Sequence, residues 1–172
     1  GEVWHSDVTC NPIPPMGSIL YLHKIPDNGG GDTLFVNMYR AYETLSAPVR
    51  SLIDGLTAVH DGGRVYRVRQ GKKVTGELPR AEHPVVRTHP ETGRKALFVN
   101  PNFTSHIAGM SRVESDALLE MLYRHAERDD FKCRFKWQPN SIAFWDNRCT
   151  MHLAMWDYYP QKRYGHRVTV AG

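Results

Sequence analysis

The sequence contains few cysteines and no long apolar run, and each shortage argues against a class of protein. Its three cysteines, Cys10, Cys133 and Cys149, are odd in number, widely spaced and free of any Cys-x-x-Cys pair. That pattern argues against a disulfide framework and against a zinc ribbon. No apolar stretch approaches the roughly 20 residues that cross a bilayer. We therefore expect a cytoplasmic protein, in a reducing compartment, with no membrane partner.

The sequence also lacks a large excess of charge of either sign, and its net charge is only +4. Basic residues gather in the stretch 62–81, which has little apolar content and is expected to be an exposed loop, either simply solvated or acting as a lid. Tyr66 is the one aromatic residue among these basic side chains, whereas nucleic-acid binding by stacking uses several. We therefore expect no nucleic-acid partner.

What is present is the composition of an ordinary globular domain, with 41% hydrophobic and 23% charged residues in a chain of 172. Alternating patterns and turn residues predict strands at 3–8, 18–23, 33–36, 83–89, 94–99, 132–137, 141–145 and 164–170. Capping residues predict helices at 37–45, 46–56 and 111–128. Many short strands with few helices favour a β sandwich or jelly roll.

A possible metal site is the most informative pattern in the chain. His5-Ser6-Asp7 and the distant His152 offer two imidazoles and one carboxylate. This is the ligand set of non-haem Fe(II) enzymes, which keep further coordination positions open. Side chains at i and i+2 of a strand share a face, so His5 and Asp7 are expected to hold one ion together. The pattern alone leaves Zn, Mn or Co in a hydrolase as alternatives.

Other histidines fit a metal site less well. His89 and Glu91 have the same spacing but fall on a predicted hairpin turn, where the carboxylate would face solvent. His60 and Asp61 are adjacent, so on a strand they point to opposite faces. Surface or packing roles are expected for the rest: His23, His83, His106, His125 and His166, with Cys10 and Cys149 filling core volume.

Longer motifs surround the candidate ligands. They are Trp4-His5-Ser6-Asp7-Val8-Thr9, Gly30-Gly31-Asp32-Thr33-Leu34, His83-Pro84-Val85-Val86-Arg87, Phe98-Val99-Asn100, Trp145-Asp146-Asn147-Arg148 and His166-Arg167. In this order and along the whole chain, they resemble the TauD/TfdA family of Fe(II)- and 2-oxoglutarate-dependent dioxygenases, taurine dioxygenase in particular.

The resemblance implies a mainly β fold, a double-stranded β-helix (jelly roll) with a few flanking α-helices. It implies that His5, Asp7 and His152 are the metal ligands and catalytic residues. Family members carry a substantial segment ahead of the His-x-Asp motif. We therefore expect residues 1–172 to form a single domain of this family that lacks its N-terminal part.

The resemblance also assigns residues to 2-oxoglutarate and to the substrate. Arg163, 11 residues after His152, matches the family arginine for the distal carboxylate of 2-oxoglutarate, which a guanidinium fork binds bidentately. Thr33 matches a threonine that contacts the same carboxylate. Arg167 matches the arginine that holds the substrate's sulfonate, and Phe103 an aromatic residue of the substrate pocket. The alternatives are surface ion pairs for both arginines and plain core packing for Phe103.

The motif Trp145-Asp146-Asn147-Arg148 is expected to be scaffold rather than to carry chemistry. Trp145 is expected to pack near the metal. Asp146 and Arg148 are expected to form structural pairs.

The function that the resemblance implies is hydroxylation of a small anionic substrate, taurine or a related sulfonate. Fe(II), 2-oxoglutarate and O₂ would take part, and sulfite, an aldehyde, succinate and CO₂ would be released. The alternatives are an alkyl sulfatase-type or phenoxyalkanoate dioxygenase of the same family, and a non-catalytic jelly-roll protein that binds metal. The resemblance also suggests a homo-oligomer, either a dimer or a tetramer.

Overall fold

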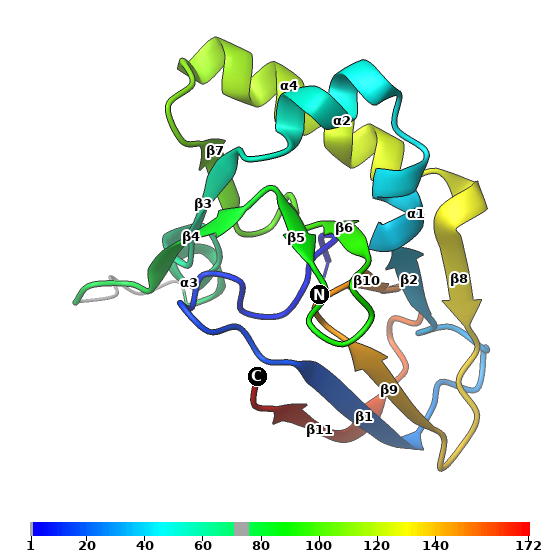
Figure 1. The fold of residues 1–172 in the computed structure, drawn as a ribbon. Helices are drawn as coiled ribbons and strands as arrows, with labels where there is room; N and C mark the ends of the chain where they lie inside the picture. Colours follow the sequence, from blue (N-terminus) through cyan, green and yellow to red (C-terminus); the bar gives the residue numbers. More distant parts are fainter. Residues whose placement is uncertain (1, 71–75) are drawn as a thin grey trace.

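Short β-strands dominate the fold (Figure 1). The structure, a computed structural model, describes residues 2–70 and 76–172, except for the side chains of residues 67–70. The strands are β1 (Gly17–Lys24), β2 (Thr33–Asn37), β3 (Thr57–Asp61), β4 (Arg80–Pro84), β5 (Val86–Thr88), β6 (Lys95–Leu97), β7 (Thr104–Ile107), β8 (Lys132–Phe135), β9 (Ile142–Asp146), β10 (Thr150–Ala154) and β11 (Tyr164–Val170). The helices are α1 (Met38–Glu43), α2 (Ala47–Ile53), α3 (Gly63–Gln70) and α4 (Arg112–Ala126), with one 3₁₀ turn, η1 (Asp129–Phe131).

Two antiparallel sheets, β11-β1-β9 and β10-β2-β8, face each other across a pocket. Side chains alternate between the two faces of a strand. Leu20 of β1 lies beside Arg167 of β11, and both line the pocket. Phe144 and Val168, which pair with Ile19, are exposed on the other face. The mainly β class is confirmed, and the facing sheets are those of a jelly roll.

A third sheet, β4-β3-β7, the hairpin β5-β6 and the helices complete the molecule. Helices α1, α2 and α4 lie together at one end, the top of Figure 1. Their apolar residues form the main core with the hairpin: Met38, Ile53, Leu97, Leu119 and Leu122 are all buried in it. Along the described residues, no helix is both long and apolar enough to cross a membrane.

The predicted strand at residues 3–8 is wrong. Only His5 pairs in β fashion, through an isolated bridge in which it exchanges N–H···O=C bonds of 3.1 and 2.8 Å with His152. Asp7 to Cys10 form a turn, in which Val8 has a φ of 49°. The side chain of Asn147, rather than a neighbouring strand, satisfies the backbone of Asp7.

The predicted exposed loop at 62–81 is also wrong in part, because residues Gly63–Gln70 form helix α3. Asp61 starts this helix by accepting a hydrogen bond from the backbone N–H of Gly63 at 2.7 Å. The many basic residues made the stretch look exposed, but Val65 is buried and packs against Cys10 and Phe103. Two of those basic residues, Lys72 and Lys73, lie outside the described residues.

The predicted helix starts are largely confirmed. Asn37 accepts hydrogen bonds from the first backbone N–H groups of α1. Ser111 and Glu114 form the capping box of α4. Ser46 precedes α2 as expected, but its side chain makes no capping bond.

Candidate active site

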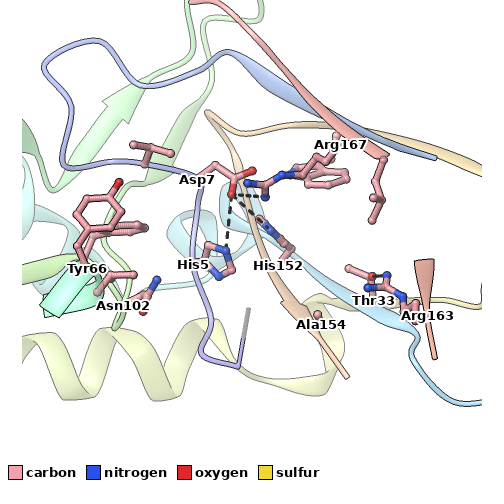
Figure 2. A pocket seen from close by; sticks show the side chains of 14 residues that line it. His5, Asp7, Thr33, Tyr66, Asn102, His152, Ala154, Arg163 and Arg167 are labelled. Carbon is pink, nitrogen blue, oxygen red and sulfur yellow. Dashed lines mark hydrogen bonds and ion pairs between the residues drawn. The ribbon is translucent and has the colours of Figure 1, made fainter. Parts of the chain in front are cut away.

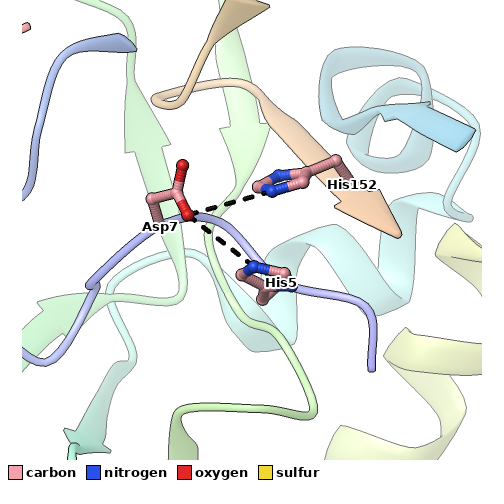
Figure 3. A group of neighbouring side chains, drawn as sticks. All are labelled: His5, Asp7 and His152. Carbon is pink, nitrogen blue, oxygen red and sulfur yellow. Dashed lines mark ion pairs between the residues drawn. The ribbon is translucent and has the colours of Figure 1, made fainter. Parts of the chain in front are cut away.

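His5, Asp7 and His152 come together in the interior of the protein (Figure 3). Asp7 Oδ1 lies 3.7 Å from His5 Nε2 and 3.8 Å from His152 Nε2. The three candidate ligand atoms lie within 4.8 Å of one another, and all three residues are buried. The structure thus brings together the residues that the sequence proposes as one metal site.

The histidine nitrogens suit a metal ion. His5 Nδ1 lies 2.7 Å from the carbonyl of Val3, which can only accept, so Nδ1 carries the proton. The lone pair of His5 Nε2 therefore faces Asp7 Oδ1 with no hydrogen between them, an arrangement that a cation stabilises. Burial lowers the pKa of His5 and of His152, which keeps both imidazoles in the neutral form that binds metals. The donor set fits a divalent cation.

The carboxylate of Asp7 is held at both oxygens. The Ser18 hydroxyl donates to Oδ2 at 2.7 Å, and Arg167 Nη1 donates to Oδ1 at 2.8 Å. Burial by itself raises the pKa of Asp7, whose exposed fraction is 2%. Interactions with His152 and Arg167 outweigh that effect and lower the pKa. Asp7 is therefore ionised at neutral pH, as a metal ligand must be.

These three residues line a pocket of about 400 Å³ (Figure 2). Thr33 and Arg163 lie on one side of the histidine and aspartate cluster, and Tyr66 and Asn102 lie on the other. Arg167 reaches the pocket from the inner face of β11. The two predicted arginines therefore share a single cavity with the candidate metal ligands.

The end of the pocket at Thr33 and Arg163 presents hydrogen-bond donors. Thr33 Oγ1 accepts from Arg163 Nη2 at 3.3 Å and from Trp137 Nε1 at 3.0 Å. With both lone pairs used, the hydroxyl proton of Thr33 remains to be donated. Arg163 Nε is buried and has no hydrogen-bond partner within the described part of the chain. This end can therefore receive a carboxylate.

A glycine makes room for Arg163. Gly31 has a φ of +82°, which side chains rarely adopt, and a Cβ there would lie 2.9 Å from Arg163 Cδ. The Arg163 guanidinium also lies over the Trp137 ring, 5.4 Å from its centre. The glycine at position 31, in the loop before β2, is thus explained by the position of this arginine.

The opposite end of the pocket is more apolar. Phe103 is buried and meets the His5 ring edge-on, with ring centres 6.5 Å apart. Phe103 also packs in a small core cluster, so the pocket role and the packing role coexist. Val65, Tyr66 and Asn102 line this end too, but sequence reasoning missed them. The nearest signal was the adjacency of Asn102 to Phe103.

The Trp145-Asp146-Asn147-Arg148 motif lies where a scaffold is expected. The Trp145 ring packs 4.9 Å from the His152 ring. Asp146 pairs with Arg148 at 2.6 Å and with His89 at 3.0 Å. His89, Asp146 and Cys149 also approach within metal-binding distance. Arg148 already neutralises Asp146, and burial raises the pKa of the Cys149 thiol. We therefore interpret Asp146 and Arg148 as a structural ion pair rather than as part of a second metal site.

His60, which is fully buried, gives a prediction for stability in acid. Burial, assisted by the charge of His83, lowers the pKa of His60 to about 3. At a pH between the pKa of His60 in the unfolded chain, near 6.5, and its pKa in the folded protein, His60 is protonated only in the unfolded chain. The contribution of His60 to the free energy of unfolding is therefore complete above pH 6.5. It is lost as the pH falls towards 3, by about 1.4 kcal/mol per pH unit.

Urea titrations between pH 7 and pH 4 measure this effect. His60→Gln is expected to lose less free energy of unfolding over that range than the unchanged protein. His23→Gln, at an exposed position, is the matched control. Parallel curves for the unchanged protein and His60→Gln would contradict the prediction.

Comparisons with known proteins agree with this geometry. The profile of the family described as Taurine catabolism dioxygenase TauD, TfdA family matches residues 1–169. A Schizosaccharomyces pombe protein, named as a candidate alpha-ketoglutarate-dependent sulfonate dioxygenase, is 43% identical over 172 residues, which are 98% of this chain and 44% of that protein. A Pseudomonas putida alpha-ketoglutarate-dependent sulfate ester dioxygenase is 38% identical over 180 residues, covering 98% of this chain and 59% of that protein.

Comparison with solved structures indicates the same family. The crystal structure of a taurine dioxygenase from Burkholderia xenovorans superimposes with a TM-score of 0.86 at 46% identity, over 98% of this chain and 56% of that one. The chain thus spans about half the length of the relatives it matches. Because the family profile covers nearly every residue, the chain belongs to the TauD/TfdA family of taurine catabolism dioxygenases.

Proposed function

We propose that the protein is an Fe(II)- and 2-oxoglutarate-dependent dioxygenase that hydroxylates a small anionic substrate, taurine or a related sulfonate. One observation carries the proposal: His5, Asp7 and His152 share a pocket with two arginines, Arg163 and Arg167. The reaction needs two anions, 2-oxoglutarate and the substrate, at one metal ion, and each guanidinium suits one anion. A relative named for a sulfonate dioxygenase supports this choice of substrate, whereas one named for a sulfate ester dioxygenase supports the alkyl sulfatase alternative.

The metal would be held by His5, Asp7 and His152. Iron bound there together with 2-oxoglutarate supplies the activation of O₂ that the oxidation requires. Two neutral imidazoles and one carboxylate cancel only one charge of a dication, so the loaded site keeps a net positive charge. That charge favours anionic ligands in the open coordination positions.

The pocket residues would divide the two anions between them. Arg163 and Thr33 would bind the distal carboxylate of 2-oxoglutarate through converging N–H and O–H donors. Arg167 would bind the sulfonate while it stays bonded to Asp7, which keeps the substrate's anion beside the metal ligands. Phe103 and Val65 would shield the reacting carbon from water.

The products follow from where the hydroxyl group is placed. Hydroxylation of the carbon that bears the sulfonate gives an unstable adduct that releases sulfite and an aldehyde. 2-Oxoglutarate leaves as succinate and CO₂. The single-domain organisation, the homo-oligomeric state and the cytoplasmic location stay predictions.

A succinate and sulfite assay tests the proposed function. With Fe(II), 2-oxoglutarate, O₂ and taurine, we expect equimolar succinate and sulfite, and neither product when a chelator removes the metal. Release of sulfate from an alkyl sulfate, or of a phenol from a phenoxyalkanoate, without sulfite from taurine would move the substrate to those classes. Absence of succinate with every one of these substrates would contradict the proposal.

A further inference from the structure

Asn147 makes an unusual set of hydrogen bonds beside the candidate metal site. It lies between β9 and β10 and is only 1% exposed. Its Oδ1 accepts from the backbone N–H of Asp7 at 2.5 Å, and its Nδ2 donates to the backbone carbonyl of Asp7 at 2.9 Å. Nδ2 also donates to the carbonyl of Pro15 at 3.1 Å. One side-chain amide therefore satisfies both backbone groups of a candidate ligand, as a paired strand does.

The segment around Asp7 depends on such bonds. Between residues 5 and 10, β pairing is limited to the single bridge at His5. Val8 follows Asp7 with a φ of 49°, a conformation that is strained for a β-branched residue by about 1–3 kcal/mol. Such a turn persists only when its surroundings fix it. Asn147 fixes the residue immediately before the strained one.

The same bonds connect ligands that are far apart in the sequence. The backbone of His5 pairs with that of His152, and the Ser6 hydroxyl donates to the carbonyl of Thr150 at 2.8 Å. The Asn147 amide then holds Asp7. Three successive residues of the N-terminal segment are thus joined to the stretch from Asn147 to His152, which leads from the end of β9 into β10.

We infer that Asn147 is a positioning residue for the metal site, because it fixes the backbone of Asp7 at the place where its carboxylate meets both imidazoles. It does not line the pocket, so it would touch neither a bound metal ion nor the substrate. This inference rests on the proposed function only in taking His5, Asp7 and His152 as metal ligands. The Trp145-Asp146-Asn147-Arg148 motif does not by itself predict this role, because Asp7, to which Asn147 is bonded, lies 140 residues away.

Titration with Mn(II), which needs no turnover, tests the inference. Asn147→Leu keeps a similar volume but removes the acceptor and both donors. We expect it to weaken Mn(II) binding by about 10- to 100-fold, the usual effect of removing a group that orients a ligand. Ser111→Ala is the matched control, because it removes a helix cap on α4 and costs about 1 kcal/mol of stability outside the pocket. Its Mn(II) affinity is expected to equal that of the unchanged protein.

Hydrogen exchange at the Asp7 amide supplies a second readout. In the unchanged protein this N–H is bonded and buried, so slow exchange is expected, and faster exchange in Asn147→Leu. A folded Asn147→Leu protein with unchanged Mn(II) affinity would overturn the inference. If this variant does not fold, Asn147→Ser takes its place with the same expectations and the same overturning result. Failure of the unchanged protein to bind Mn(II) would instead count against the metal site, and exchange at Asp7 would then decide the role of Asn147.

Discussion

Replacing Asp7 with alanine is expected to abolish metal binding and turnover. Asp7 is the one anionic group of the candidate ligand set, and its carboxylate is almost completely buried. Its removal leaves two neutral imidazoles beside the Arg167 guanidinium, which has then lost its partner and repels a dication. Loss of a group that merely orients a ligand costs 10- to 100-fold in affinity, so loss of the charged ligand should cost more than about 100-fold. Mn(II) titration and succinate release measure the two effects.

Two further variants separate loss of charge from loss of shape. Asp7→Asn keeps the size of the side chain but removes its charge, and it is expected to lose metal binding nearly as completely as Asp7→Ala. Asp116→Asn breaks an exposed ion pair with Arg112 on α4 and is expected to bind Mn(II) normally. An Asp7→Ala protein that keeps full turnover would refute both the metal site and the proposed function.

The candidate ligands were accessible from the sequence, but their local conformation was not. The His-x-Asp spacing of His5 and Asp7 is common by itself, but the motifs around it and around His152 are specific in combination, so the three residues stood out. The strand assigned to residues 3–8 failed because the backbone of Asp7 is bonded to the side chain of Asn147. A local pattern carries no information about a hydrogen bond that spans 140 residues.

Helix α3 shows a second limit of sequence reasoning. Six basic residues between 62 and 81 made the stretch look like a solvated loop. Among its described side chains, Val65 and Tyr66 line the pocket, but two such residues are too few to give a clear helical period. By contrast, the helix at 112–126 was found because a capping box marks its start and it runs for 15 residues.

The arginines at 163 and 167 fall between these cases. Their spacing of four predicts one face of a strand, and both do reach the same pocket. Arg163, however, precedes β11, which begins at Tyr164, so strand alternation is not what places it. Contact with Thr33 and the space left by Gly31 place it instead.

Replacing Arg163 with methionine is expected to raise the Kd for 2-oxoglutarate strongly. The guanidinium offers paired N–H donors to the distal carboxylate, and methionine fills similar space without donors or charge. Hydrogen bonds to charged groups contribute about 1.5–3 kcal/mol each, so a net loss of about 2–4 kcal/mol is expected, a roughly 30- to 1,000-fold rise in Kd. Titration of Mn(II)-loaded protein with 2-oxoglutarate measures this change without turnover.

The pattern across neighbouring variants distinguishes the two ends of the pocket. Arg163→Lys keeps the charge but loses the fork, so its Kd for 2-oxoglutarate should lie between those of the unchanged protein and Arg163→Met. Arg167→Met should instead weaken taurine binding more than 2-oxoglutarate binding, because its guanidinium lies at Asp7 and not at Thr33. Arg112→Met, at an exposed ion pair, serves as the control. If Arg167→Met weakened 2-oxoglutarate binding as much as Arg163→Met does, the two arginines would not be divided between the two anions as proposed.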